Sequence, residues 1–392
     1  MPTQQTIELP GTPKLIPPQV GGDAEFAGFG PATRSVDPDS LATGLSQTQP
    51  GDTLYLQAGI YPVGLGGKGL PVPSGTSEAA RVTIAKDPGA PQGSVILRPP
   101  SSAYHRVLDF DAGLAYVTFD GLVLDGASVG YEVAKFASGA HHVILRNSEL
   151  FGGVGGILAG GSYNQYINLH VHHTRGTDFD HGLYLSGDHH LVEGCEVHHN
   201  PGWGVHFYSG DNPGGIRDNV IRGNRTYENA AAGARGAGIL VHSGRNNLIM
   251  NNVSYGNAEG IQLGGSQNKA YNNTVYGNRG KGIVYYASEQ VEIVNNIIYA
   301  NGAAVVDDGG NAGATVSENL LADPGFVNAA AGDFHLTTGS PAVGAGASLS
   351  AVPTDLDGRL RANPPTVGAY EPGGGPTVAT LPAPTNLRIV VR

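Results

Sequence analysis

The stretch Gly238–Asn301 reads GILVHSGRNNLIMNNVSYGNAEGIQLGGSQNKAYNNTVYGNRGKGIVYYASEQVEIVNNIIYAN and decides the fold. It repeats a six-residue pattern of glycine, aliphatic, variable, apolar, variable and small residue, which also occurs upstream. The pattern begins at Gly156, Gly182, Gly204, Gly238, Gly260 and Gly282, at intervals of 26, 22, 34, 22 and 22 residues. Such a period indicates stacked short units, none of which buries its apolar face alone. We place the extra residues of the long interval in one insertion at 225–236.

A second pattern recurs out of phase with the first, as NNVSYGN, NNTVYGN and NNIIYAN. We expect the second asparagine of each copy to point inward and to hydrogen-bond along the stack. The expected ladder consists of Asn219, Asn252, Asn273 and Asn296. The last asparagine of each copy suits a left-handed turn; these are Asn257, Asn278 and Asn301. Cys195 falls in the ladder column between Leu169 and Asn219, which predicts a buried structural thiol and not a nucleophile.

Composition limits the classes of partner. The chain has 392 residues, 61 glycines, one cysteine and a formal net charge of −11. This charge argues against duplex DNA or an anionic membrane surface as a partner, because both require clustered Lys and Arg. The negative net charge does not exclude an acidic polysaccharide as a partner, since a local basic patch or a bound cation makes the electrostatic potential in a groove positive. One cysteine rules out an internal disulfide, and no apolar run approaches the length of a membrane helix.

The chain divides into three parts by composition. Residues 1–36 are expected to form an extended segment that lacks the basic and apolar regions of a signal peptide. Residues 37–371 contain the repeats, and DPDSLATGLSQT at their start predicts a short cap helix at 37–48. Residues 372–392 begin as a Gly/Pro linker, and TNLRIVV at their end resembles the first strand of a truncated fibronectin type III-like module.

Together these features resemble the right-handed parallel β-helix proteins of the pectate-lyase-like superfamily. The resemblance covers roughly residues 51–371, from PGDTLYLQAGIY to LADPGFVNAAAGDFHLTTGSPAVGAG and VGAYEP. It implies an all-β, single-stranded solenoid of about ten rungs. A leucine-rich repeat has a similar period, but its LxxLxL signature is absent. The resemblance does not fix the activity, because this scaffold carries lyases, epimerases, hydrolases, esterases and adhesins.

Strand alternation decides which side chains face solvent. In the glycine pattern the aliphatic positions face inward, so the variable positions form two outward columns. The first is Asp109, Lys135, Leu158, Tyr184, His206, Leu240 and Gln262. The second is Asp111, Ala137, Gly160, Ser186, Tyr208, His242 and Gly264. With rungs about 4.8 Å apart, Tyr184, His206, Tyr208 and His242 fall within one sugar-sized patch.

The chemistry that suits this patch is proton abstraction beside a uronate carboxyl group, which requires a base, an acid and a group that neutralises the carboxylate. We predict His206 as the base, Tyr184 or Tyr208 as the acid, and His181 as the alternate base. The substrate-binding residues are predicted to be Lys135, His242, Trp203, Asp178, Asp180 and Arg217. The small residues Gly160, Ser186 and Gly264 are expected to leave a groove beside the patch.

The resemblance also bears on cofactors. Calcium-dependent pectate lyases place carboxylates near a basic residue, so Asp109 and Asp111 beside Lys135 are candidate calcium ligands; no organic cofactor is expected. DFDH at Asp178 is similar to the DPH motif of mannuronan epimerases, with Phe179 at the Pro position. A column of His172, His198, Arg222, Tyr255, Tyr276 and Tyr299 is predicted to stack its side chains and not to bind metal. The pairs that begin at His141 and His189 fall in turns and are not expected to bind metal.

The sequence therefore predicts a secreted, monomeric enzyme that cleaves an acidic polysaccharide by β-elimination. A uronan C5-epimerase remains open, because it begins with the same proton abstraction. A glycoside hydrolase also remains open and needs two carboxyl groups about 5 to 9.5 Å apart, for which Asp178, Asp180, Asp188 and Asp211 are available on turns. The third alternative is a glycan-binding or adhesive β-helix, whose aromatic residues stack on sugars without proton transfer.

Overall fold

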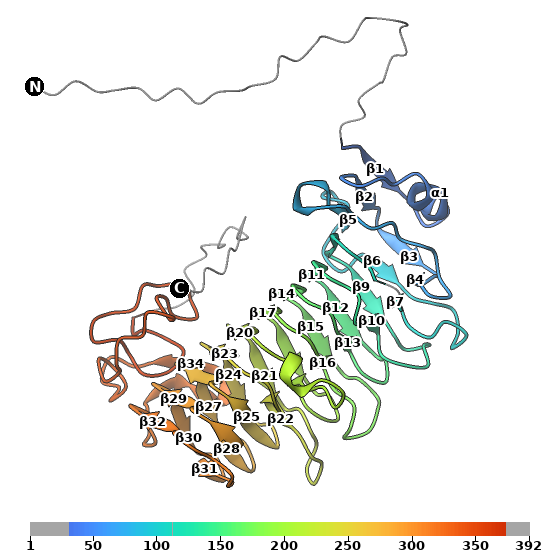
Figure 1. Ribbon diagram of the computed structural model, residues 1–392. Helices are drawn as coiled ribbons and strands as arrows, with labels where there is room; N and C mark the ends of the chain where they lie inside the picture. The colour runs from blue at the N-terminus through green and yellow to red at the C-terminus, as the bar shows by residue number, and fades with distance from the viewer. Residues whose placement is uncertain (1–30, 112, 374–392) are drawn as a thin grey trace, which may run out of the picture. The chain divides into compact units, whose positions relative to one another are not determined.

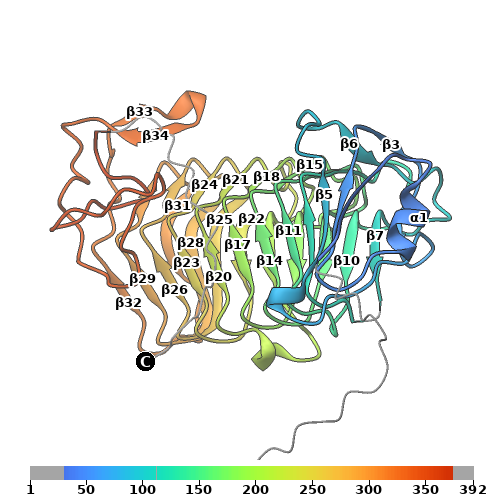
Figure 2. The same ribbon diagram turned by 90° about the horizontal axis from the view of Figure 1, so that it is seen from above.

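The computed structural model describes residues 31–111 and 113–373, and it is a parallel β-helix built from three sheets (Figures 1 and 2). Each turn of the chain adds one strand to each sheet, so the chain visits the sheets in rotation. Figure 1 shows the strands of successive turns lying side by side while the colour advances along the sequence.

Sheet A is twelve-stranded and consists of β1 (Thr33–Val36), β2 (Thr53–Leu56), β5 (Val82–Lys86), β8 (Val117–Asp120), β11 (Ile144–Arg146), β14 (Gln165–Ile167), β17 (Leu191–Glu193), β20 (Val220–Arg222), β23 (Leu248–Met250), β26 (Lys269–Tyr271), β29 (Glu292–Val294) and β32 (Thr315–Ser317). Sheet B is ten-stranded and consists of β3 (Gly59–Tyr61), β6 (Val95–Leu97), β9 (Val123–Asp125), β12 (Glu149–Phe151), β15 (His170–His172), β18 (Glu196–His198), β21 (Arg225–Tyr227), β24 (Val253–Tyr255), β27 (Thr274–Tyr276) and β30 (Ile297–Tyr299). Sheet C is also ten-stranded and consists of β4 (Leu65–Gly66), β7 (Leu108–Phe110), β10 (Ala134–Phe136), β13 (Ile157–Ala159), β16 (Leu183–Leu185), β19 (Val205–Phe207), β22 (Ala237–Val241), β25 (Glu259–Ser266), β28 (Lys281–Glu289) and β31 (Ala303–Asp307).

The remaining elements lie before and after the solenoid or in its turns. Helix α1 (Leu41–Ser46) buries Leu41 and Leu45 over the first turns, so the predicted cap helix is confirmed with shorter bounds. The antiparallel hairpin β33 (Phe326–Asn328) and β34 (Asp333–Leu336) follows the last rung. Three short 3₁₀ segments complete the structure: η1 (Glu78–Ala80), η2 (Pro213–Gly215) and η3 (Ala329–Ala331). The predicted fibronectin-like start at 385–391 lies outside the described residues.

The interior is apolar because one side chain in two on each strand points inward. Aliphatic columns such as Leu183, Val205 and Ile239 are fully buried, and they join one continuous cluster along the stack. The register confirms the first outward column of the sequence prediction, because Lys135 pairs with Asp109 and Tyr184 pairs with His206. Within the described part of the chain, no helix is long and apolar enough to span a membrane.

Three asparagine ladders, and not one, run along the turns. The first links Asn219, Asn247 and Asn268; the second links Asn224, Asn252, Asn273, Asn296 and Asn319; the third links Asn200, Asn229, Asn257, Asn278 and Asn301. In each ladder a side-chain amide donates to the side-chain oxygen of the next rung, which satisfies polar groups that would otherwise be buried without a partner.

Two details of the predicted ladder were wrong. Asn224, and not Asn219, shares the column of Asn252 and also accepts a hydrogen bond from the Cys195 N–H. The left-handed residues are the first asparagines of the NN pairs, with φ of 55°, 51° and 62° at Asn251, Asn272 and Asn295. Asn257, Asn278 and Asn301 instead form the third ladder, since their side chains point into the turn interior.

A single cause explains the shifted column. The extra residues of the long rung are divided between two turns, and part of them lie between β19 and β20, where η2 is found. The sequence prediction placed all the extra residues after Arg225. It therefore assigned the ladder and aromatic positions of this rung five residues too early, at Asn219 and Arg222 in place of Asn224 and Tyr227. The same shift placed Arg222 in the aromatic column of sheet B, where Tyr227 in fact pairs with His198 and Tyr255.

Candidate functional site

The outward face of sheet C gathers aromatic and imidazole side chains on adjacent rungs. Tyr184 on β16 and His206 on β19 are direct neighbours, with ring centroids 5.2 Å apart. Tyr208 follows β19 and lies 5.7 Å from His206 and 6.3 Å from Tyr184. His181, on the turn before β16, lies 4.8 Å from His206. The four predicted catalytic side chains therefore form one group, which we call the sheet C cluster.

Two imidazoles at the centre of the cluster share one hydrogen bond. His206 Nδ1 lies 3.2 Å from His181 Nε2, so one ring donates and the other accepts. The remaining nitrogens, His206 Nε2 and His181 Nδ1, are buried and have no hydrogen-bond partner. A buried polar atom without a partner costs free energy, and in native proteins it commonly marks a functional position.

Burial also sets the protonation of these groups. Burial lowers the pKa of His181 to about 4, and burial together with the nearby His181 holds the pKa of His206 well below its ordinary value. Burial and the nearby Tyr208 raise the pKa of Tyr184. Near pH 7 both imidazoles are therefore neutral and the phenol keeps its proton, which is the arrangement of a base beside an acid.

Trp203 packs against both imidazoles. Its ring lies 5.2 Å from His181, edge to face, and 5.2 Å from His206 at a tilt of 34°. The indole Nε1–H donates to Gln262 Oε1 at 3.0 Å, and Gln262 in turn donates to Glu259. These two hydrogen bonds fix Trp203 over His206, whose surface is only 7% exposed. Sequence reasoning named Trp203 and placed Gln262 in the column, but it missed the link between them, because they lie two rungs apart.

The turn that carries His181 is held by Asp180. Its carboxylate accepts hydrogen bonds from the Thr177 N–H at 2.7 Å and the Thr177 hydroxyl at 3.0 Å. The Asp180 carbonyl accepts from the Gly202 N–H of the next rung at 2.9 Å. Asp178 belongs to the same turn and is half-buried. Asp180 is therefore tied to its own turn, and it positions His181.

The far end of the cluster is occupied by His242 and Tyr286. Tyr208 meets the His242 ring edge to face at 4.9 Å, and His242 Nδ1 lies 2.9 Å from the Tyr286 hydroxyl. A bulge between β25 and β28 shifts the register there, and the Tyr286 ring lies against Gly264. Tyr286 thus fills the space that the small residue at 264 was expected to leave open. Sequence reasoning missed it because a bulge cannot be read from the period.

The predicted calcium ligands lie next to basic side chains. Asp109 is buried and pairs with Arg106 at 3.2 Å, and Asp111 pairs with Lys135. Arg106 also pairs with Glu132 at 2.8 Å. Calcium takes six to eight oxygen ligands, whereas these carboxylates are already neutralised by cations. The position does not fit a calcium site, and the Lys135 ammonium is occupied by Asp111.

Most of the nearby arginines serve structural roles. Arg217 pairs with Asp188 and, at 3.5 Å, with Asp218, on the turn that leads into sheet A. These ion pairs hold Arg217 at that turn, and neither involves a residue of the sheet C cluster. Arg235 was not singled out from the sequence, yet its exposed guanidinium lies 6.0 Å from the ring of Phe179, two residues before His181. This contact places the insertion that carries Arg235 beside the 178–181 turn.

The other residues of interest lie elsewhere. Cys195 is buried, and burial raises the pKa of its thiol to about 12, as expected for a structural residue. His172 and His198 stack at 5.2 Å with an angle of 5°, as predicted, between Phe151 and Tyr227 on sheet B. A hollow of about 810 Å³ lies between sheets A and B, away from the sheet C cluster. The sheet C cluster thus lies on a different face of the solenoid from this hollow.

Comparison with known proteins agrees with the architecture. The family profile described as "Right handed beta helix region" matches residues 155–321. No curated protein sequence matches the chain. The structure is similar to that of pectate lyase Pel9A, at 18% identity, with 88% of this chain and 97% of that chain covered and a TM-score of 0.65.

Two further solved structures are similar. One is a rhamnogalacturonan lyase, at 14% identity, with 76% of this chain and 91% of that chain covered and a TM-score of 0.50. The other is the A-module of Azotobacter vinelandii mannuronan C-5 epimerase AlgE4, at 19% identity, with coverages of 76% and 87% and a TM-score of 0.49. At identities this low, the likenesses to the two lyases show a shared fold alone. The chain is a right-handed parallel β-helix protein and shares the fold of pectate lyase Pel9A.

Proposed function

We propose that the protein is a polysaccharide lyase that cleaves a uronate-containing polymer by β-elimination at the sheet C cluster. The observation that carries the proposal is the neutral His181–His206 pair, whose two outer nitrogens are buried without partners beside two tyrosines. Groups with perturbed pKa values that gather on one face are typical of active sites. Two solved lyases with this fold, a pectate lyase and a rhamnogalacturonan lyase, support an acidic glycan as the substrate class.

In the proposed reaction the imidazole pair removes a proton and a tyrosine supplies one. His206 Nε2 takes the proton from C5 of the uronate, the C4–O4 bond breaks, and a C4–C5 double bond forms. Tyr184 or Tyr208 donates its phenolic proton to the departing O4, and solvent returns the proton from the imidazolium to the tyrosinate. His181 stabilises the imidazolium through the shared hydrogen bond. Each of these steps is carried by the chain's own side chains and solvent.

Two further groups serve the substrate in this proposal. The exposed guanidinium of Arg235 neutralises the uronate carboxylate, which lowers the cost of removing the adjacent proton. Trp203 must leave its position over His206, which breaks its hydrogen bond to Gln262, before a sugar ring reaches Nε2. The buried base is therefore uncovered only when an aromatic lid gives way to substrate.

Because the proposed base His206 is buried, one alternative is also favoured. In it the protein is a glycan-binding β-helix whose aromatic face stacks on sugars without proton transfer. A C5-epimerase shares the first step and differs in returning a proton to the opposite face of C5. The hydrolase alternative is weaker, because Asp180 is bonded to Thr177 and Asp188 is paired with Arg217. We propose that the enzyme acts outside the cell as a monomer, where such polymers occur.

The test is ultraviolet absorbance of the unsaturated product after incubation with a panel of uronic-acid polymers, with calcium and with chelator. We expect activity in both conditions and a roughly 10²- to 10⁴-fold loss in His206→Gln and in the responsible Tyr→Phe variant. Tyr163→Phe, an exposed tyrosine on the turn before β14, is the matched control and should keep full activity.

The outcomes separate the alternatives. Reducing ends without absorbance would indicate hydrolysis, and deuterium incorporation at C5 without cleavage would indicate epimerisation. Binding of the polymer without any product would indicate the adhesive alternative. Elimination that survives His206→Gln and both Tyr→Phe changes would place the reaction elsewhere on the molecule.

A further inference from the structure

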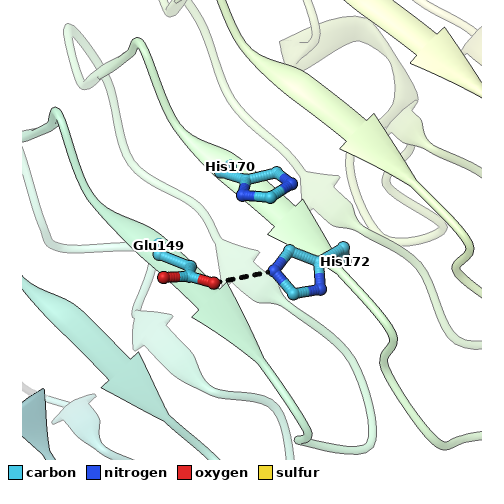
Figure 3. A group of neighbouring side chains, drawn as sticks. All are labelled: Glu149, His170 and His172. Atoms are coloured by element: carbon cyan, nitrogen blue, oxygen red, sulfur yellow. Dashed lines mark hydrogen bonds and ion pairs between the residues drawn. The ribbon is translucent and has the colours of Figure 1, made fainter. Parts of the chain in front are cut away.

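A second histidine-rich group lies on the outward face of sheet B. The reaction proposed for the sheet C cluster does not use it. Glu149 on β12 pairs in register with His170 on β15, and His172 on β15 pairs with His198 on β18. Alternation along β15 brings His170 and His172 to the same face. Three successive rungs therefore place a carboxylate and three imidazoles side by side, and Figure 3 shows Glu149, His170 and His172 facing one another.

The ligand atoms of this group converge. His172 Nε2 lies 3.0 Å from Glu149 Oε1, and His170 Nε2 lies 2.7 Å from His198 Nε2. One ligand atom each from Glu149, His170 and His172 lie within 4.8 Å of one another. Ligands held tetrahedrally at about 2.0–2.1 Å from zinc lie roughly 3.3 Å apart. Among Glu149, His170 and His172 the separations bracket this spacing, from 3.0 Å to at most 4.8 Å, without any rearrangement of the strands. His198 lies beside this group and contacts it through His170.

We propose that Glu149, His170 and His172 bind one divalent transition-metal ion of the zinc class, with solvent at the fourth position. Two nitrogens and one carboxylate oxygen suit zinc and its first-row neighbours, whereas calcium and magnesium require oxygen ligands. The ion would join β12 and β15, and so cross-link two rungs of the solenoid. Ring stacking accounts for His172 and His198, but it does not explain why His170 and Glu149 aim their polar atoms into the same space.

Hydrogen bonds around the group support the ligand role. His198 Nδ1 lies 2.7 Å from His199 Nδ1, and His199 Nε2 lies 2.6 Å from Glu228 Oε2. His172 Nδ1 lies 2.9 Å from His173 Nδ1. Metal-binding histidines typically donate their second ring N–H in this way, which fixes the tautomer and the ring direction. The contact with His173 therefore orients His172 Nε2 toward the proposed ion, while the Glu228–His199–His198 chain fixes His198 beside His170.

An entry route is present. Glu149 and His170 also line the hollow of about 810 Å³ between sheets A and B, so an ion from solvent reaches the group from that side. The groups on sheets B and C lie on different faces of the solenoid. Metal binding and lyase activity are thus separate properties, and either one can fail without the other.

The experiment uses the full chain without an affinity tag, treated with chelator and then titrated with Zn²⁺ by calorimetry. We expect one Zn²⁺ per chain and a rise in Tm on binding. Glu149→Gln and His170→Gln/His172→Gln should lose this binding, while Co²⁺ in the wild-type protein should give the visible absorption of a tetrahedral site. His173→Gln should weaken the affinity about 10- to 100-fold, because it removes only the hydrogen bond that orients His172.

His141→Gln/His142→Gln is the matched control, since this pair has the same Nδ1 contact, at 3.0 Å, outside any such group of ligands among the described residues. It should bind Zn²⁺ as the wild type does. Circular dichroism establishes that each variant is folded, and Glu149→Gln keeps a hydrogen-bonding group of the same size. Absence of stoichiometric binding by the wild type would overturn the proposal, as would equal losses in the control and ligand variants.

Discussion

At the scale of single residues, the imidazoles of the sheet C cluster are more buried than their solvent-facing register suggests. An outward column position does not ensure exposure, because Trp203 covers His206. Burial outweighs the opposing effect of the Asp180 charge on the pKa of His181 and keeps the His181–His206 pair neutral. The pair is thus prepared to accept a proton, but it makes the folded state sensitive to acid.

We predict an acid-dependent loss of stability from His181. Its folded pKa of about 4 lies below its unfolded value of 6.5, so the unfolded chain binds more protons between these limits. The contribution is complete above pH 6.5 and falls by up to about 3 kcal/mol as the pH drops to 4. Measured as Tm against pH, His181→Gln should flatten this decline relative to wild type. The exposed His105→Gln is the control, and an identical slope in His181→Gln and wild type would contradict the prediction.

At the scale of the element, the two residues of each Asn-Asn pair in the turns have different structural roles. The second asparagine is buried in a ladder, while the first adopts the left-handed turn and bonds the C-terminal segment. Asn251 Nδ2 donates to the Thr354 carbonyl at 2.8 Å, Asn272 Nδ2 to Thr366 at 3.1 Å and Asn295 Nδ2 to Ala347 at 2.8 Å. One short sequence motif therefore stabilises the turn, the stack and the terminal covering.

Asn252→Ala should destabilise the solenoid by about 2–4 kcal/mol, because it leaves buried partners unsatisfied. Asn252 accepts from both nitrogens of Asn224 at 2.9 Å and donates to the Ile221 carbonyl at 2.9 Å. Urea denaturation followed by circular dichroism measures the change. Asn212→Ala, at an exposed turn position, should cost less than about 0.5 kcal/mol. Similar losses in the two variants would show that the ladder adds no stability of its own.

At the scale of the whole described chain, different elements cover the first and the last turns of the solenoid. Helix α1 covers the first turns with apolar side chains. The C-terminal segment lies against the later rungs through both apolar packing, as of Val352 and Tyr370, and polar contacts. Arg361 is central there: it pairs with Glu371 at 3.3 Å, and both side chains are at most 6% exposed. It also donates to Asn251 Oδ1 at 2.6 Å, which ties this segment to the stack.

Arg361→Met should therefore loosen the C-terminal segment and cost about 3–5 kcal/mol, because Glu371 is left buried without its cation. Limited proteolysis should then cut within residues 340–371 before the solenoid is lost, and Tm should fall. Lys281→Met removes an ion pair with Asp308 at the surface and serves as the control, with an expected change of at most about 1 kcal/mol. Unchanged proteolysis of Arg361→Met would refute the assigned role.

The sequence by itself determined the repeat, the parallel β-helix, the inward columns and the register of sheet C, because a glycine and aliphatic period recurs with each rung. It also brought Tyr184, His206 and Tyr208 together, since neighbours across a parallel ladder follow from counting. Counting failed where insertions and bulges interrupt the period, as at Asn219, Arg222 and Tyr286. Only the tertiary structure shows the hydrogen bond between Trp203 and Gln262, the ion pairs of Asp109 and Asp111, and the meeting of Glu149 with His170 and His172. These depend on side-chain directions between rungs and on turns of unequal length, which periodicity does not encode.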